Sequence, residues 1–154
     1  MAGVGSAAPL FRLEALDGKS YSLAELAQHS PVALVFFKVT CPVCQFTLPF
    51  LERIAASSSL RVVAISQDDA KATRAFHERF GVSILTLLDT AASGYEVSNK
   101  YGISSVPSLF LVDSSLTVAL AGSGFSKADL EELGRRAGMP PFRPGESVPA
   151  YKPG

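Results

Sequence analysis

Cys41 and Cys44 are the only cysteines in the chain, and two residues separate them. Residues three positions apart in a helix share a face, so the two sulfurs can reach each other if a helix begins here. The first N–H groups of a helix lack intrahelical partners and carry partial positive charge, which stabilises a thiolate relative to a thiol. Such a pair can attack a disulfide with one sulfur and resolve the mixed disulfide with the other.

The residues that flank the pair predict a helix start. Residues 31–37 form an apolar run that predicts a buried strand, and residues 42–56 place apolar side chains at helical spacing. Pro42 follows Cys41, and proline suits the first position of a helix. We therefore expect Cys41 at the helix N-cap as the nucleophile. Cys44, one turn further on, should be more buried, stay a thiol and act as the resolving group.

Strands and helices alternate along most of the chain. The first element is a predicted hairpin over 11–21 with an Asp17-Gly18 turn. Helices are predicted over 23–28, 69–80, 92–101 and 127–137. Further strands are predicted over 60–65, 84–88, 109–112 and 117–121, and Gly122 and Gly124 are expected to end the last of them. This order predicts a three-layer α/β fold, with a central mixed β-sheet flanked by helices. Residues 1–8 are predicted to be a flexible lead, 9–138 a single domain, and 139–154, which hold five prolines, an extended tail.

Composition narrows the classes of partner and compartment. The 154 residues carry 14 Lys and Arg against 14 Asp and Glu, with no long basic run, which argues against nucleic acid or an anionic membrane as the main partner. The longest apolar run, 31–37, is far shorter than the roughly 20 residues of a membrane-spanning helix. The first residues lack the pattern of a signal peptide. As written, the protein is expected to be cytoplasmic, or periplasmic or membrane-tethered if a signal or anchor sequence was removed.

The sequence resembles the thioredoxin-like superfamily on several motifs. Cys41-Pro42-Val43-Cys44 follows an apolar strand, Pro49 lies five residues after Cys44, and Val106-Pro107 precedes a predicted strand. The resemblance implies a thioredoxin-like three-layer fold. It also implies a cis Val106–Pro107 peptide bond against the cysteine pair, where the backbone of Val106 pairs with an extended substrate. Substrate-binding residues would then be Pro42, Val43, Val106 and Pro107.

Two additions resemble the TlpA/ResA-type branch, which is related to the redoxin and AhpC-TSA proteins. One is a hairpin extension over 9–19, and the other is an inserted helix and strand over 69–88. The resemblance covers about 9–138. It implies a thiol–disulfide oxidoreductase with a redox-active CXXC centre, no cofactor and a role in cell redox homeostasis. The implied partners are protein disulfide or dithiol clients and an upstream electron donor or acceptor, and the protein is expected to be a monomer.

Three positions depart from the family pattern. Thr40 stands where the family has a tryptophan before the first cysteine, and the chain contains no tryptophan. Val35 stands where thioredoxins have a buried acid, and Thr47 where the ResA-type branch has a glutamate. No obvious general base for the resolving thiol remains, which leaves Lys38 or a water molecule for that role. These three departures affect the expected rate and direction of thiol–disulfide exchange, but not the type of reaction that the two cysteines can perform.

Other interpretations of the two cysteines are a thiol peroxidase, a metal-delivery module on the same fold and ordinary buried side chains. A peroxidase of this fold would carry a Pro-x-x-x-Thr-x-x-Cys pattern, but Leu34 and Lys38 occupy those positions. Tetrahedral zinc would need two more ligands, and His29 and His77 have no motif spacing to the pair. We therefore expect no metal site.

Overall fold

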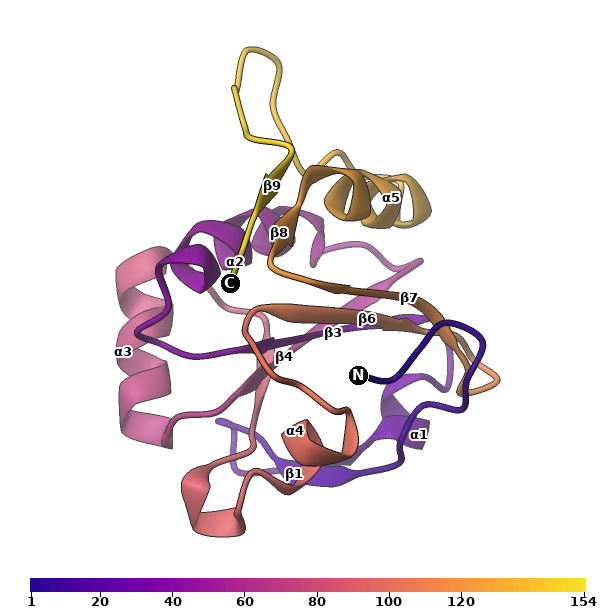
Figure 1. Cartoon of the computed structure of the whole chain (residues 1–154), viewed down its shortest axis with the longest axis vertical. Helices are drawn as coiled ribbons and strands as arrows, with labels where there is room; N and C mark the ends of the chain where they lie inside the picture. The colour runs from indigo at the N-terminus through magenta and orange to yellow at the C-terminus, as the bar shows by residue number, and fades with distance from the viewer.

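A five-stranded mixed sheet organises the protein, as the computed structural model of residues 1–154 shows (Figure 1). The strand order is β5-β4-β3-β6-β7. The strands are β3 (Val32–Phe37), β4 (Arg61–Ser66), β5 (Leu85–Leu88), β6 (Ser108–Val112) and β7 (Val118–Ser123). β3 pairs in parallel with β4, and β4 with β5, whereas β6 runs antiparallel to both β3 and β7. The central strand, β3, is buried along its whole length.

Alternate side chains of β3 enter two separate apolar cores, because successive residues of a strand point to opposite faces. Val35 and Phe37 belong to the core beneath α2 (Pro42–Ile54), α3 (Ala70–Phe80) and α5 (Lys127–Ala137). Leu34 and Phe36 belong to the core beneath α1 (Leu23–Leu26), α4 (Glu96–Lys100) and the hairpin of β1 (Arg12–Glu14) and β2 (Ser20–Ser22). Helices therefore cover both faces of the sheet (Figure 1), which confirms the predicted three-layer α/β fold with its hairpin and inserted helix and strand.

Side-chain caps fix most helix boundaries where the sequence predicts them. The hydroxyls of Ser22 and Ser126 and the carboxylate of Asp69 each accept a hydrogen bond from the N–H three residues later, as an N-cap does. Gly81 and Gly138 end α3 and α5 in the left-handed conformation, which costs glycine little.

Two boundary predictions are wrong. The helix predicted over 92–101 is divided into a short 3₁₀ turn, η1 (Ala91–Ser93), and α4, because the chain takes the left-handed conformation at Gly94 and again at Tyr95, with a φ of 51°. The other error concerns Gly122, which lies inside β7 rather than ending it. A Cβ at residue 122 would meet the carboxylate of Asp129, which lies against the backbone of Gly122 and would have to shift.

Both ends of the chain contact the central domain. In the lead, Ala2 and Gly5 donate backbone hydrogen bonds to Tyr101 and Val118. In the tail, β9 (Tyr151–Lys152) pairs antiparallel with β8 (Phe125–Ser126). The predicted division into 1–8, 9–138 and 139–154 stays a prediction. The structure adds that both terminal segments form hydrogen bonds with the domain, although the tail makes a projecting loop before β9 (Figure 1).

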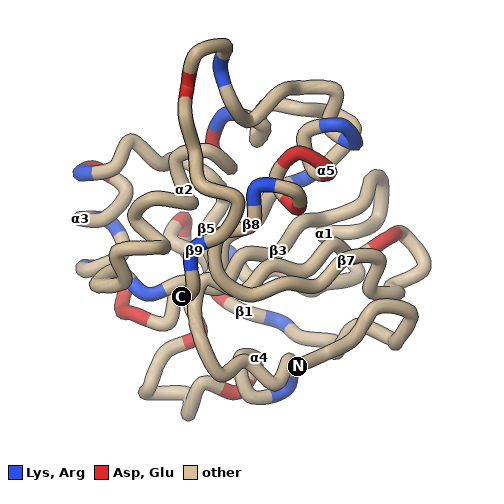
Figure 2. Tube along the Cα trace, turned by 45° about the horizontal axis from the view of Figure 1, so that its top comes forward, with Lys and Arg blue, Asp and Glu red and all other residues tan.

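Charged residues of both signs are interspersed over the helices and loops (Figure 2). This distribution agrees with the equal numbers of basic and acidic residues in the sequence. None of the helices combines the length and the apolar character that crossing a lipid bilayer requires.

Candidate functional site

The strand-to-helix junction places the cysteine pair at the carboxyl end of β3. Cys41 has an extended conformation and is the N-cap of α2, with Pro42 at the first helical position, as predicted. Two side chains hold the connecting loop. Asp68 accepts a hydrogen bond from the N–H of Val39 at 2.8 Å, and the amide of Gln45 donates to the carbonyl of Val39 at 2.9 Å. The first cysteine therefore follows a loop that is fixed on both sides.

The Cys41 sulfur lies between a helix start and a backbone carbonyl. Its Sγ accepts a hydrogen bond from the N–H of Cys44 at 3.2 Å and donates one to the carbonyl oxygen of Val106 at 3.5 Å. Both thiols are free in this structure. Cys41 is half-buried and reachable from solvent, whereas Cys44 is 0% exposed. The helix N-terminus therefore faces the more accessible of the two sulfurs, and its N–H groups are available to an anionic sulfur.

The environment of Cys44 favours the neutral thiol. Burial raises the pKa of the Cys44 thiol well above its usual range, and the hydrogen bond with Cys41 and the nearby charge of Asp68 act in the same direction. A desolvated thiolate without a cationic partner is costly, which is the physical cause of this shift. The two sulfurs therefore differ in access and in charge environment, although they lie one helical turn apart.

The other predicted site residues surround Cys41 on two elements. Pro42 is exposed and Val43 half-buried in the first turn of α2. Val106 and Pro107 lie on the loop before β6, and the peptide bond between them is cis, as predicted. Pro107 is buried, whereas Val106 is half-buried and presents its carbonyl to Cys41. The structure thus brings together the loop of Val106 and the sulfur of Cys41, which are 65 residues apart in the sequence.

The missing acid of the family pattern is not replaced on β3 or α2. Val35 is buried in the apolar core, and the hydroxyl of Thr47 donates to the carbonyl of Val43 at 2.7 Å. Lys38 is exposed and lines a polar cavity of about 200 Å³ together with Gln67 and with Val106, so this cavity borders the loop that contacts Cys41. No three His, Cys, Asp or Glu side chains are arranged so that they could hold a metal ion.

Asp68 is the site residue that sequence reasoning missed, because an aspartate just before a helix is typical of an N-cap. Asp69 alone caps α3, whereas Asp68 reaches the loop before Cys41. The parallel pairing of two strands is the feature that places Asp68 near the cysteine pair. Asp68 follows β4, which is parallel to β3, so the carboxyl ends of both strands lie at the same edge of the sheet.

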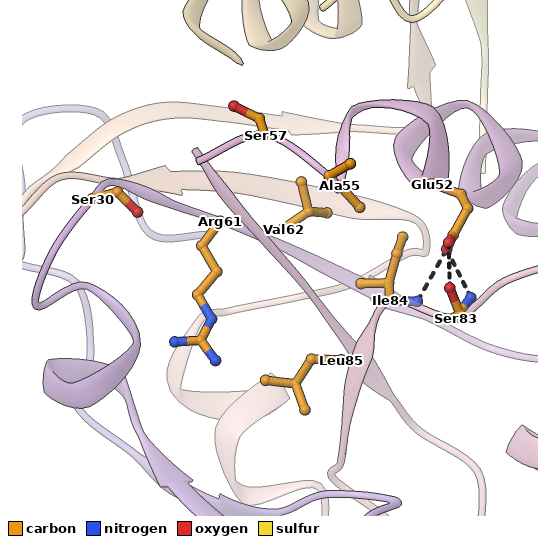
Figure 3. A pocket seen from close by; sticks show the side chains of 10 residues that line it. Ser30, Glu52, Ala55, Ser57, Arg61, Val62, Ser83, Ile84 and Leu85 are labelled. Atoms are coloured by element: carbon orange, nitrogen blue, oxygen red, sulfur yellow. Dashed lines mark hydrogen bonds between the residues drawn. The ribbon is translucent and has the colours of Figure 1, made fainter. Parts of the chain in front are cut away.

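A larger cavity, of about 500 Å³, lies near the starts of β3, β4 and β5, at the opposite ends of these strands from the cysteine pair (Figure 3). Its lining includes Arg61, at the start of β4, and Glu52, near the end of α2. The carboxylate of Glu52 accepts hydrogen bonds from the backbone N–H groups of Ser83 and Ile84 and from the Ser83 hydroxyl, which fixes the loop before β5. No cysteine lines this cavity, so it is separate from the thiol pair.

Known proteins are similar to this chain in sequence or in structure. The chain is 29% identical over 117 residues to the thiol-disulfide oxidoreductase ResA of Halalkalibacterium halodurans, and the match covers 73% of this chain and 64% of that protein. It superposes on a structure of MTB dsbF with a TM-score of 0.70 at 27% identity, covering 83% of this chain and 92% of the other. The thioredoxin domain of a thiol-disulfide oxidoreductase from Bacteroides vulgatus has the same fold, with a TM-score of 0.77 at 20% identity and coverage of 88% and 98%.

The protein spans about 64% of the length of the ResA relative that it matches. The model of the AhpC/TSA family matches residues 4–121, a range that contains the β1–β2 hairpin, the cysteine pair, the inserted helix and strand and the Val106–Pro107 loop. Since this match covers most of the sheet and the whole thiol site, the chain belongs to the AhpC/TSA family and has a thioredoxin-like fold.

Proposed function

We propose that the protein is a thiol–disulfide oxidoreductase that exchanges its Cys41–Cys44 dithiol or disulfide with disulfides of other proteins. The observation that supports this most directly is the different environment of two sulfurs one helical turn apart. Cys41 is accessible and lies at the N-terminus of α2, where it accepts the N–H of Cys44, whereas Cys44 is fully buried. The relative named thiol-disulfide oxidoreductase supports the same activity.

In the proposed reaction, the Cys41 thiolate attacks one sulfur of a client disulfide. A bond forms between Cys41 and that sulfur, the client disulfide breaks, and the second client sulfur leaves as a thiolate. Cys44 then loses its proton and attacks Cys41, which forms the Cys41–Cys44 disulfide and releases the first client sulfur as a thiolate. Two electrons pass from the dithiol to the client. The same steps in reverse oxidise a client dithiol.

The first turn of α2 and the loop before β6 are the proposed substrate-binding surface. Pro42 and Val43 supply apolar contacts beside the nucleophile. The backbone of Val106, next to Pro107, would pair with an extended client segment close to the sulfur of Cys41. The proposed partners are such client proteins and an upstream electron donor or acceptor. A monomeric state is part of the same proposal, since few large apolar side chains are exposed.

Replacement of each cysteine tests the proposed roles. We expect Cys41→Ser to abolish insulin reduction, because the attacking sulfur is lost. Cys44→Ser should form mixed disulfides with insulin that persist, because no second sulfur remains to release the client. The measurements are insulin turbidity and non-reducing electrophoresis. Full insulin reduction by the Cys41→Ser protein would contradict the proposal, and a fast reaction of the wild type with hydrogen peroxide would favour the thiol peroxidase instead.

A further inference from the structure

The tail at residues 148–154 has no place in the exchange reaction, yet it lies beside the nucleophile. We propose that residues 150–154 occupy the surface on which the protein binds an extended client segment, and that a client displaces them. This inference rests on the proposed function, because it describes the kind of client segment that binds beside the cysteine pair. The tail would act as an internal competitor that resembles a client.

Backbone pairing holds the tail as a client strand would be held. Lys152 pairs with Phe125 and Tyr151 with Ser126 in antiparallel register, and the N–H of Lys127 donates to the carbonyl of Ala150 at 3.0 Å. β8 has no strand partner other than β9. Addition of an extended segment to a sheet edge is a common mode of peptide recognition, since backbone hydrogen bonds supply affinity without requiring one sequence. The edge of β8 is therefore suited to any extended segment that can reach it.

Two close approaches place the tail backbone firmly on this surface. A Cβ at Gly124 would overlap the carbonyl oxygen of Lys152, and a Cβ at Gly154 would overlap the carbonyl oxygen of Val106. That same Val106 oxygen accepts the hydrogen bond from the Cys41 thiol. Gly154 therefore covers the Val106 backbone beside the Cys41 sulfur, which is the backbone with which a client segment is proposed to pair. A protein disulfide cannot use this approach while the tail is docked.

The side chain of Lys152 indicates which client chemistry the surface accepts. Its Nζ lies 5.1 Å from the centre of the Phe46 ring, within the range of a cation–π interaction. Phe46 packs edge-on against Phe50 and Phe125, so its face is held in place. A client strand that pairs with β8 in the same register would carry a lysine or arginine at the position of Lys152, over the Phe46 ring.

Matched lysine variants of the full chain test whether the tail competes with clients. Lys152→Glu replaces the cation over Phe46 by an anion, which the ring face repels. We expect kcat/KM for insulin reduction to rise about threefold, mainly through a lower KM. Lys71→Glu makes the same change of charge on an exposed residue of α3 and should leave the rate unchanged. Equal rates for the wild type and Lys152→Glu would contradict the proposal, whereas an inactive wild type would instead contradict the proposed oxidoreductase.

A larger effect is expected when the tail contacts are removed together. Deletion of residues 150–154 removes the strand partner of β8 but retains both residues of the Arg53–Glu146 ion pair. It should raise kcat/KM about tenfold, with the unfolding midpoint measured as a control for folding. A synthetic peptide of residues 148–154 should then inhibit the deleted protein competitively. The same peptide with Glu in place of Lys152 should inhibit about fivefold more weakly. Unchanged activity on deletion, or no inhibition by the peptide at millimolar concentration, would overturn the inference.

Discussion

At the scale of single residues, the chemistry depends on how differently the protein treats two thiols. Cys41 has a helix N-terminus and solvent beside it, whereas burial raises the pKa of Cys44. An acid with a raised pKa in the folded state stabilises the fold below its unfolded pKa, roughly 8.5 for cysteine. That stabilisation is lost as the pH rises above this value, because the unfolded chain then releases a proton that the folded chain keeps.

Asp68 is the charged residue whose effect on this pair can be tested most directly. Asp68→Asn keeps an oxygen that can accept the N–H of Val39 but removes the negative charge, so we expect the pKa of Cys44 to fall. The measurement is the pH dependence of Cys44 alkylation in a Cys41→Ser background. Asp69→Asn, which changes an exposed helix cap, is the control and should leave the profile unchanged. An identical profile for Asp68→Asn would show that its role is confined to positioning the loop.

At the scale of elements, Asp89 links the end of β5 to α4, which leads into the loop of Val106. Asp89 is fully buried, and its carboxylate accepts the N–H groups of Val97 and Ser98 and the Ser98 hydroxyl. These bonds give acceptors to the N–H groups in the first turn of α4. The N-cap residue of α4, Tyr95, makes no side-chain hydrogen bond that could do so.

Asp89→Ala should therefore reduce the free energy of unfolding by about 2–4 kcal/mol, since it leaves buried donors without an acceptor. Asp113→Ala removes a carboxylate that accepts the N–H groups of Ser115 and Thr117 in a surface turn, and a smaller loss is expected there because water can replace it. Urea denaturation of both variants is the measurement. A loss of 1 kcal/mol or less for Asp89→Ala would mean that water or a shifted backbone accepts hydrogen bonds from the N–H groups of Val97 and Ser98 instead.

At the scale of the whole molecule, one ion pair connects the tail to α2. Arg53 donates two hydrogen bonds to Glu146, at 2.6 and 2.8 Å, and a third to the carbonyl of Pro141 at 2.9 Å. Phe142 packs against Phe50 and so extends the apolar core into the tail. The segment before β9 is therefore fixed on the same helix that carries the cysteines.

The ion pair predicts a pH-dependent tail. Hydrogen bonds from Arg53 and from the N–H of Arg143 lower the pKa of Glu146 from 4.5 to about 2. Since this folded-state pKa lies below the unfolded one, the stabilisation is complete above about 4.5 and is lost as the pH falls toward 2. The protection of the amides in 143–152 against hydrogen exchange, relative to the intrinsic rate at each pH, should fall in this window. Glu146→Gln should remove that pH dependence, which separates it from Glu132, whose pKa is also lowered to about 2.

The sequence by itself determined the structural features whose physical cause lies within a few residues. The apolar run over 31–37, the Cys41-Pro42 helix start and the caps at Ser22, Asp69 and Ser126 have their physical cause within a few positions, so the strand, the CXXC turn and the helix starts could be predicted. The division of the helix at Gly94 and Tyr95 escaped prediction because Asp89, buried eight residues before its partner Val97, provides the capping bonds.

Tertiary structure alone decided what surrounds the sulfurs. The contact between Cys41 and Val106 was expected from resemblance, but the reach of Asp68 to Val39 and the docking of Gly154 on Val106 were not. These contacts join segments that only the pairing of β3 with β4 and β6, and of β8 with β9, brings to one edge. Periodicity records which face of an element is buried, but not which distant backbone will lie against it, because register and strand order are set by packing of the whole core.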